Sequence, residues 1–440
     1  MARNEIWISF VFFLTTGCYI FLHSKLTSQV IKEIRVQNMS DTMKRKFADD
    51  NLAHNPKLTM KQNEMLQQIL TRAKNKTKYI LEWHGRKHVM DYKNLPPEIC
   101  GKCIITQNRS MIYHPDTGAV IFFYNHFNSS DNPIIRRTDQ LHVWYTAESP
   151  ASIYTMRNMY LKKENRYRFN ITQTYRRDSG IYHPYGSLNQ ILKDKMDRKE
   201  HENISKLLVN KTDVAVAVVS NCDSTPGAAV RKELIEKMIE FGLEVDTFGK
   251  CFDNIKTEKH HDFESSLQKY KFYLAFENAY HCRDYITEKF FINGLRAGIL
   301  PIVWGAKKDD YEAVAPTDSF IFVEDFPSIK SFVEYIKFLD SNDNEYLKYF
   351  KWIERGVLSL PMHGRQTRLC QLCRQIHGIN VEDIYDPSYN ATNPERPVFT
   401  EKIARREVRD LRTWFYETEN KECFQHRKTS IKRMLNFTDF

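Results

Sequence analysis

Glu288 and Lys289 stand side by side where an apolar run of the sequence gives way to a helical pattern. Thr287 before them can cap a helix N-terminus, so the spacing predicts a helix that begins around Thr287 and carries both charges in its first turn. A glutamate suits the partial positive charge of a helix N-terminus, whereas a lysine there is disfavoured. A strand–loop–helix junction with unpaired backbone N–H groups and a lysine can bind a phosphate, and the neighbouring carboxylate can bind ribose hydroxyls. From the residues alone, a solvated Glu–Lys pair at a helix start is an equally good interpretation.

The elements expected around this junction alternate between strands and helices. The run 213–222 is almost continuously apolar, as a parallel strand buried on both faces would be. Apolar residues recur at helical spacing within 225–242, and Gly242 marks the end of that helix. Further strands are expected at 243–251, 271–279, 299–306 and 319–326, and helices at 263–270, 287–298 and 328–341. This alternation predicts a doubly wound parallel sheet, whose ligands bind at the carboxyl ends of the strands.

A separate group of strands is expected nearer the N-terminus, up to about residue 205. Its signals are short β-branched and aromatic runs that end in polar residues, at 78–85, 119–126 and 141–149. Two such sheets in series leave a cleft between them. The expected fold class is therefore α/β, with two Rossmann-like, doubly wound domains that face a cleft.

The first 77 residues predict a membrane anchor and a stalk. Residues 6–22 contain no charged side chain and are just long enough to cross a bilayer. A cleaved signal peptide is the alternative, but its apolar part would be shorter and would end in a small-residue cleavage site, which is not seen here. Residues 1–5 would then be a cytoplasmic tail, and the polar residues 23–77 a stem that builds no core.

Asn-x-Ser/Thr sequons occur more often than the composition would produce by chance. Such sequons carry glycans only in a lumenal or extracellular chain, so the excess favours a lumenal region behind the anchor. The alternative is that the sequons are fortuitous. Asn38 lies in the stem, and the candidate glycosylation sites are Asn75, Asn108, Asn128, Asn170, Asn203, Asn210, Asn390 and Asn436.

Eight of the nine cysteines follow the expected anchor, an even number that suits disulfides in an oxidising compartment. Four of them form two Cys-x-x-Cys pairs, Cys100 with Cys103 and Cys370 with Cys373. Cross-bridging of the two pairs is favoured over a four-thiolate zinc site, because zinc ribbons usually keep their halves closer in sequence.

Four cysteines remain after these pairs. Cys222 and Cys251 are the next expected disulfide, because two adjacent parallel strands would end at these positions. Cys282 and Cys423 are left over, and only the count of cysteines would pair them.

The net charge of +10 is spread over 65 basic and 55 acidic residues and is not concentrated in one stripe. A lumenal chain meets no nucleic acid, so no nucleic-acid partner is expected. Attraction of anionic sugar nucleotides or of an anionic membrane surface accounts for the excess of basic residues.

Four sequence blocks resemble those of the α1,3-fucosyltransferase family, glycosyltransferase family 10. Residues 276–305, "FENAYHCRDYITEKFFINGLRAGILPIVWG", are similar to the family's long signature. "YRRDSGIYHPYG" at 175–186 and "ESP" at 148–150 resemble two further blocks, and "VVSNCDSTPGAAVRKELIEKM" resembles a strand that leads to an arginine-containing helix. The C-terminal "CQLC" fits as well.

The resemblance covers about residues 78–375 and departs from the family pattern in places. Ala279 and Cys282 alter the insert after the first strand of the signature, and "FFINGLRAG" replaces the usual helix sequence. These changes should affect packing more than chemistry. The extension at 376–440 is longer than in compact family members, and it could shape acceptor choice or pack on the donor domain.

The resemblance implies a Golgi enzyme of GT-B fold that transfers L-fucose from GDP-β-L-fucose to an N-acetylglucosamine hydroxyl with inversion. It assigns the pyrophosphate to Arg231 and Lys289, the ribose hydroxyls to Glu288, the nucleoside to Tyr285 and the role of general base to Glu148. Inversion needs one carboxylate to take the acceptor proton, and fixed cations to meet the charge of the leaving GDP. Glu277 and Asn278 would line the same donor site with less definite roles. A helix-starting Glu148 without a catalytic role is the alternative for that residue.

Tyr175, Arg176 and Arg177 belong to a matching block, but their roles stay open. The two arginines could help to bind phosphate or could form salt bridges with Asp178. The resemblance implies domains at 78–205, on the acceptor side, and at 206–375, on the GDP-fucose side.

Cofactors and partners follow from the same resemblance. The sequence contains no Asp-x-Asp triplet, which metal-dependent glycosyltransferases commonly use, so no divalent metal is expected to be required. The expected partners are a glycan acceptor on a glycoprotein or glycolipid and the Golgi cisterna membrane, which a single-pass type II protein would span. The sequence gives no oligomeric state and does not distinguish the core N-glycan GlcNAc from an outer LacNAc. The alternative function is a catalytically inactive lumenal protein that binds glycans or GDP-sugars.

Overall fold

The computed structural model describes residues 73, 75–84, 97–128, 130–134, 136–157, 167–252, 266–355, 364–378, 408, 411–416 and 423. Within these residues, no helix combines the length and the apolar character needed to span a membrane. The expected anchor at 6–22, almost all of the expected stem, and three sequons, Asn38, Asn390 and Asn436, lie outside the described residues.

The first sheet has six strands in the order β2-β1-β3-β4-β5-β6, and all of their pairings are parallel. Its strands are β1 (Lys78–Glu82), β2 (Cys103–Thr106), β3 (Thr117–Phe123), β4 (Leu141–Tyr145), β5 (Ile171–Thr174) and β6 (Ile181–Tyr182). The strand order reverses between β1 and β3, as in other doubly wound sheets.

The second sheet has five parallel strands in the order β11-β10-β9-β7-β8. Its strands are β7 (Asp213–Val218), β8 (Val245–Phe248), β9 (Tyr270–Phe276), β10 (Leu300–Trp304) and β11 (Ile321–Phe322). The order reverses between β7 and β9, and this reversal is where a doubly wound sheet opens a crevice for ligands at its carboxyl edge.

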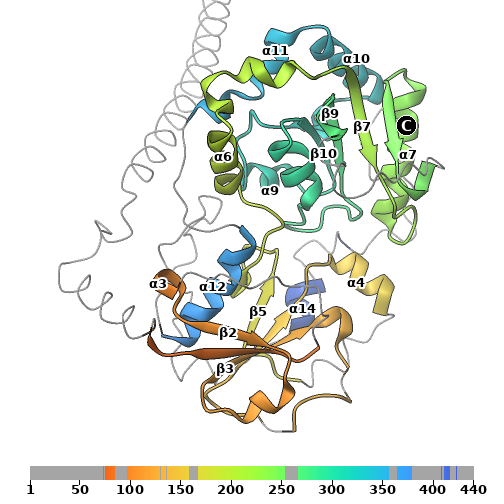
Figure 1. The fold of residues 1–440 in the computed structure, drawn as a ribbon. Coiled ribbons are helices and arrows are strands. Elements are labelled where there is room, and N and C mark those ends of the chain that lie inside the picture. Colours follow the sequence, from red (N-terminus) through yellow and green to blue (C-terminus); the bar gives the residue numbers. More distant parts are fainter. Residues whose placement is uncertain are drawn as a thin grey trace, which may run out of the picture. The chain divides into compact units, whose positions relative to one another are not determined.

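The helices alternate with these strands, as the sequence predicted for the second sheet (Figure 1). The α-helices are α3 (Pro97–Cys100), α4 (Pro150–Arg157), α6 (Leu188–Asp197), α7 (Pro226–Glu240), α9 (Lys308–Glu312), α10 (Ile329–Asp340), α11 (Asp343–Lys348), α12 (Gly364–Ile376) and α14 (Leu411–Tyr416). The 3-10 helices are η1 (Arg109–Tyr113), η2 (Tyr124–His126), η3 (Glu200–Glu202), η4 (Ile204–Leu208), η5 (Lys250–Phe252), η7 (Val323–Asp325) and η8 (Lys351–Arg355), and η6 (Lys289–Arg296) is a π-helix. Of the expected helix at 263–270, residues 266–270 are described: 266–267 are helical, 268–269 form a turn and Tyr270 already begins β9.

Alternate residues of the first sheet pack into two separate cores, because successive side chains of a strand point to opposite faces. Ile121 and Val143 belong to a core that α12 covers, whereas Phe122 and Trp144 belong to a core that includes α14. Two helices from the C-terminal part of the chain therefore cover opposite faces of the N-terminal sheet.

The position of α12 corrects the expected domain boundary at residue 375. The sequence placed this helix in the second domain, yet it packs on β1, β3 and β6 of the first sheet. Buried Leu369, Leu372 and Ile376 supply the apolar contact, and two disulfides fix the helix there. The expected extension joins the first core through α14, and its Cys423 also ties it to the second domain by a disulfide with Cys282.

The second sheet is buried on both faces, as its apolar strands predicted. Every residue of β10 is buried, and α7 and α10 contribute their apolar faces to the same core. A capping box formed by Ser328 and Ser331 fixes the start of α10. The two sheets together confirm the expected GT-B class, with two Rossmann-like α/β domains.

Candidate active site

The carboxyl ends of β7 and β9 bring two helix N-termini to the switch point of the second sheet. After β7 the chain passes Asn221 and enters α7, which Thr225 caps by accepting a hydrogen bond from the Ala228 N–H. The Thr225 hydroxyl also donates to the Asn278 carbonyl, just after β9. The start of α7 is thereby held against the loop that leads from β9 to η6. Both helix starts present partial positive charge to the same edge of the sheet.

Two glycines allow this close approach. A Cβ atom on Gly227 would lie 2.8 Å from the Asn278 carbonyl oxygen, and one on Gly305 would lie 2.7 Å from the Glu277 Cβ. Gly305 also has a φ of +124°, which side-chain-bearing residues rarely adopt. Larger residues at either position would push the loop away from the sheet.

Arg231 is a buried cation between the two strand ends. Its Nη1 donates to the Phe276 carbonyl at 3.0 Å, and its Nη2 donates to the Asn221 carbonyl at 2.8 Å. Its Nε is buried and has no hydrogen-bond partner among the described residues. Burial lowers the pKa of Arg231, while the nearby Glu277 carboxylate acts in the opposite direction. Arginine is not deprotonated in proteins, so this guanidinium is a buried positive charge that keeps one hydrogen-bond donor unused.

Glu277 fixes the start of η6 by accepting hydrogen bonds from Thr287. Its fully buried carboxylate accepts the Thr287 N–H at 2.7 Å and the Thr287 hydroxyl at 2.9 Å. Burial raises the pKa of Glu277, and the Lys289 ammonium, with Nζ 3.7 Å from Oε2, opposes that rise. Glu277 was expected to contact the sugar donor directly, but its carboxylate has no exposed surface through which it could do so. Its geometry is that of a support for Thr287 and Lys289.

Glu288 and Lys289 occupy the helix start at which the sequence placed them. Glu288 is the residue that precedes η6, and Lys289 is its first residue. The Lys289 Nζ lies 3.0 Å from Glu288 Oε1 and donates to the Thr287 hydroxyl at 3.1 Å. Burial would lower the pKa of Lys289, but Glu277 and Glu288 raise it above the ordinary value. The ammonium is therefore firmly charged, partly buried and held at a helix N-terminus.

The π-helical form of η6 was not expected from the sequence. The Ala297 N–H donates to the Ile292 carbonyl, and the Ile299 N–H donates to the Gly294 carbonyl, each five residues back. Such wide turns are rare and often occur at functional sites.

Glu148 lies in the short connection between β4 and α4, two residues before the helix begins. Its N–H donates to the Thr146 hydroxyl, and Ser149 starts the helix by accepting from the Ser152 N–H. Burial and the Glu288 carboxylate raise the pKa of Glu148, while Lys289 lowers it. Ala151 of α4 is buried in one cluster with Ala279 and Tyr285 of the loop that joins β9 to η6, residues 277–288, which we call the donor-side loop. The segment that carries Glu148 therefore packs beside the loop that leads to Glu288 and Lys289. A carboxyl group with a raised pKa is suited to taking up a proton near neutral pH.

Three tyrosines pack between the segment that carries Glu148 and the donor-side loop. The Tyr285 ring lies 5.0 Å from the Tyr175 ring and 6.2 Å from the Tyr185 ring, centroid to centroid. The Tyr185 hydroxyl donates to the Ala147 carbonyl, next to Glu148. Tyr285 was expected here, and Tyr185 was missed as a site residue, although the "HPYG" block that contains it was noted. Asn278 also lies in this loop, with a buried side-chain oxygen that has no partner among the described residues.

Arg176 and Arg177 both form ion pairs, which favours the structural interpretation over phosphate binding. Arg176 pairs with Asp178 through two hydrogen bonds and stacks over the Trp414 ring. Arg177 pairs with Asp284 and Asp310 of the second domain.

The disulfides follow the expected pattern and include one that was left open. Cys100 pairs with Cys370, and Cys103 with Cys373, so the two Cys-x-x-Cys motifs are cross-bridged. The other disulfides are Cys222–Cys251, as expected, and Cys282–Cys423, which only the cysteine count suggested.

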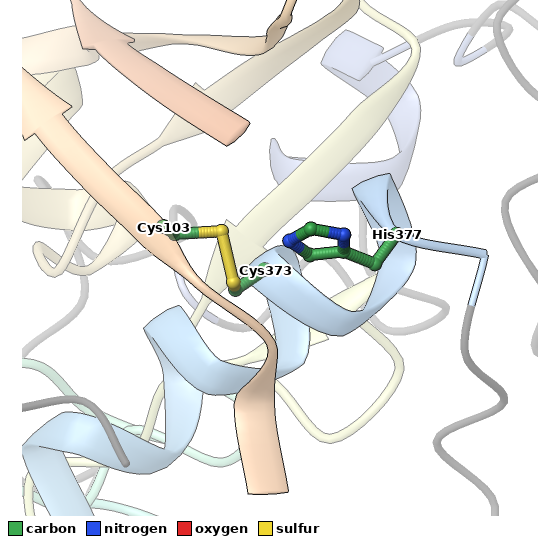
Figure 2. A group of neighbouring side chains, drawn as sticks. All are labelled: Cys103, Cys373 and His377. Atoms are coloured by element: carbon green, nitrogen blue, oxygen red, sulfur yellow. A yellow bond between two sulfur atoms is a disulfide. The ribbon is translucent and has the colours of Figure 1, made fainter. Parts of the chain in front are cut away.

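One cluster of described residues has metal-ligand geometry. Figure 2 shows Cys103, Cys373 and His377, whose possible ligand atoms lie within 4.8 Å of one another. Both sulfurs are joined in a disulfide, so they are not thiolates, and His377 Nε2 lies 3.2 Å from the Lys102 carbonyl. The four-thiolate zinc alternative is therefore not the arrangement present.

The described sequons differ in exposure. Asn75, Asn108, Asn128, Asn203 and Asn210 are exposed. Asn170 is buried, and its side-chain oxygen accepts the His142 N–H at 2.7 Å. A glycan cannot leave a buried amide without opening the sheet, so the expectation for Asn170 does not fit the structure.

Taken together, fold and site define a two-domain α/β protein with cations at the switch point of one sheet and a carboxylate just after a strand of the other, which is the architecture of GT-B glycosyltransferases. The family model described as "Glycosyltransferase family 10 (fucosyltransferase) C-term" matches residues 208–389, and that described as "Fucosyltransferase, N-terminal" matches residues 75–186. The chain belongs to glycosyltransferase family 10, the fucosyltransferases, and the resemblance found in its sequence is confirmed.

Individual relatives agree with this family. The chain is 35% identical over 290 residues to glycoprotein 3-alpha-L-fucosyltransferase A of Drosophila melanogaster, covering 65% of this chain and 52% of that protein. It thus spans about half the length of the fly protein. It is 31% identical over 328 residues to alpha-(1,3)-fucosyltransferase 7 of Homo sapiens, covering 72% of this chain and 86% of the human protein. A crystal structure of an α1,3-fucosyltransferase with GDP-fucose has 17% identity and a TM-score of 0.45, over 72% of this chain and 97% of that one.

Proposed function

We propose that this chain is an inverting α1,3-fucosyltransferase that moves L-fucose from GDP-β-L-fucose to a GlcNAc hydroxyl of a glycan. The observation that carries the proposal is that the segment bearing Glu148 packs on the donor-side loop that leads to Glu288 and Lys289. The Tyr185 hydroxyl donates to the Ala147 carbonyl, and the Tyr185 ring lies 6.2 Å from the Tyr285 ring of that loop. An inverting displacement needs a base on one side of the sugar and fixed cations on the other. The acceptor oxygen attacks one face of the sugar C1 atom, while the phosphate oxygen departs from the opposite face. Membership of the family supports the same assignment.

In the proposed reaction, Glu148 takes the proton of the acceptor hydroxyl while that oxygen forms a bond to C1 of fucose. The bond between C1 and the β-phosphate oxygen breaks on the opposite face, and GDP leaves with the electron pair. Arg231 and Lys289 meet the charge that develops on the diphosphate, and the adjacent helix N-termini add to this stabilisation. Glu288 is assigned to the ribose hydroxyls, and Tyr285 to the wall beside the nucleoside.

No step of this proposal requires a divalent metal. Arg231 and Lys289 supply two positive charges at the place where a metal-dependent enzyme would hold its ion. We expect transfer to persist in a metal chelator, and a complete loss of activity that added Mn²⁺ restores would contradict this expectation.

The acceptor is a glycan of a glycoprotein or glycolipid in the Golgi lumen under this proposal. Four disulfides and five exposed sequons among the described residues support a lumenal catalytic region, as expected for a single-pass type II protein. Relatives differ in the acceptor that their names state, glycoprotein for the fly protein and galactosyl-N-acetylglucosaminide for a human one. The core GlcNAc of N-glycans and outer LacNAc therefore both belong in an assay.

The test is transfer of labelled fucose by the full chain, produced in a secretory host and solubilised. GDP-fucose is supplied with GlcNAc-terminated, LacNAc and N-glycan core acceptors, and the product linkage is determined by mass spectrometry and NMR. An α1,3-linked product from the wild type, and a much slower reaction of Glu148→Gln, is the expected result. Binding of GDP without transfer to any acceptor would instead favour an inactive binding protein.

A further inference from the structure

The loop from β9 to η6 has an unusual backbone at Asp284, one residue before Tyr285. Asp284 has a φ of +60°, and His281 in the same loop has a φ of +51°. Residues other than glycine rarely adopt this left-handed conformation unless their surroundings hold them there. The Asp284 carboxylate is buried, so the contacts of this side chain determine the path of the loop.

The Asp284 carboxylate is bound by Arg177 of the first domain and also interacts with Asp310 and Arg283 of the second. It accepts the backbone N–H of Arg177 at 2.9 Å and the Arg177 Nε at 2.6 Å. The same guanidinium donates from Nη2 to Asp310, in α9, at 3.1 Å. Arg177 therefore joins the segment after β5 of the first sheet to two separate segments of the second domain.

The place of this contact connects it to the chemistry. Asp284 precedes Tyr285, whose ring packs against Tyr175 of the first domain. Glu288 and Lys289 stand three and four residues further on, at the end of the loop that packs against Ala151 beside Glu148. A shift of the Asp284 backbone would move the donor-side groups relative to Glu148, because no glycine interrupts 279–289.

We propose that Arg177 is a positioning residue for fucosyl transfer, which acts through Asp284 to hold the donor-side loop in register with Glu148. The inference rests on the proposed function. The guanidinium is occupied by two carboxylates, so it is directed at the protein rather than at a diphosphate. A displacement of about 1 Å at a reacting centre can slow a reaction about 100-fold, so such a contact has a measurable effect on turnover.

The experiment compares Arg177→Met, Asp284→Asn and the double variant with the wild type, using the full chain. We expect each single variant to lower kcat about 10-fold to 100-fold, with the Kd for GDP changed less than about 3-fold. The double variant should be no slower than the slower single variant, because both changes break the same contact. Arg177→Lys should recover part of the lost kcat. Lys308→Gln, which removes the surface ion pair with Asp325 from the same helix as Asp310, is the matched control and should leave all values unchanged.

A second measurement does not depend on turnover. Hydrogen exchange of the peptide that covers 279–289 should become faster in Arg177→Met and in Asp284→Asn, and remain normal in Lys308→Gln. This result would support the contact even if the chain transfers no fucose, which separates it from the proposed function. If Arg177→Met does not fold, Arg177→Lys and Asp284→Asn serve the same comparison.

Three results would overturn the proposal. One is a Kd for GDP that rises at least 10-fold in Arg177→Met but stays normal in Asp284→Asn, because Arg177 would then bind the donor directly. Additive losses in the double variant would show that the two residues act separately. Unchanged exchange in 279–289 would show that the contact does not hold the loop.

Discussion

Cys282 and Cys423 form a disulfide across 141 residues of sequence, joining the donor-side loop to the C-terminal segment. Both residues are buried in one small cluster with Ala151, Tyr175 and Tyr285. Residue 423 lies beyond the region matched by the family models, which ends at residue 389. A segment outside the family's matched region is thus attached directly at the candidate active site.

Replacing both Cys282 and Cys423 by serine should lower the free energy of unfolding by about 2–4 kcal/mol, because the unfolded chain regains the entropy of a long loop. The measurement is denaturant unfolding under non-reducing conditions. Cys222→Ser with Cys251→Ser is the matched control, and its shorter loop should cost about 1 kcal/mol less. A larger loss in the control pair would contradict the argument from loop length. The KM for GDP-fucose should also rise in the Cys282 pair, because the donor-side loop loses an anchor.

Phe415 tests whether α14 is an integral part of the first domain. Its side chain is fully buried, with its ring 4.8 Å from that of Trp144 on β4. Phe415→Ala should lower the free energy of unfolding by about 3–5 kcal/mol, because it leaves a cavity against the sheet. Phe415→Leu, which refills most of the volume, should cost less than half of that value. A change within experimental error in Phe415→Ala would show that the helix is peripheral.

Glu148→Gln should cut kcat by about 100-fold or more while the affinity for GDP stays near normal, since a glutamine cannot take the acceptor proton. The pH dependence of kcat/KM also tests whether Glu148 acts as a base. Burial and Glu288 raise the pKa of Glu148, so kcat/KM of the wild type should fall as the pH drops through a value above 4.5. The acid limb of this profile should be missing in Glu148→Gln. Equal turnover in the two proteins would remove Glu148 from the mechanism.

Much of the second domain could be predicted because its signals are local. The strand expected at 271–279 is Tyr270–Phe276, and the helix expected at 225–242 is Pro226–Glu240. Long apolar runs and a regular helical spacing leave few alternatives for such segments. The π-form of η6 could not be predicted, because over eight residues its periodicity hardly differs from that of an α-helix.

The first domain was predicted less well, because its completion depends on contacts distant in sequence. The cross-bridged Cys-x-x-Cys motifs already implied that residues 370–373 lie beside Cys100, which conflicts with a domain boundary at 375. Helix α14 gave no signal of its own, since Leu411–Tyr416 is short and its partner Trp144 lies far away in the chain.

The charged residues of the candidate site could be predicted, but the residues that hold them in place could not. Glu288 and Lys289 could be found because they lie at a helix start, where the sequence pattern changes, whereas Glu148 and Arg231 were assigned through the family resemblance. The support that Glu277 gives to Thr287 depends on burial and hydrogen-bond direction, which spacing alone does not reveal.

Lys289→Met should weaken GDP binding at least about 10-fold, because it changes the charge of the site. Arg231, Lys289, Glu277 and Glu288 together carry two positive and two negative charges. Without Lys289 the set has a net charge of −1 beside the diphosphate. Isothermal titration with GDP measures the change, and Lys308→Gln serves as the control for a lysine elsewhere on the domain. Equal affinity in Lys289→Met and the wild type would contradict the assignment of Lys289 to the diphosphate.

The same variant should be less stable at neutral pH, because the buried Glu277 loses the cation beside it. Burial already raises the pKa of Glu277 above 4.5, and removing Lys289 should raise it further. The loss of stability should therefore grow as the pH rises through that raised pKa and should disappear at pH values below 4.5, where Glu277 is neutral in both folded and unfolded chains. Adding Glu277→Gln to Lys289→Met should recover part of the stability at neutral pH but not the affinity for GDP. Recovery of both would show that Lys289 supports Glu277 rather than binding the donor.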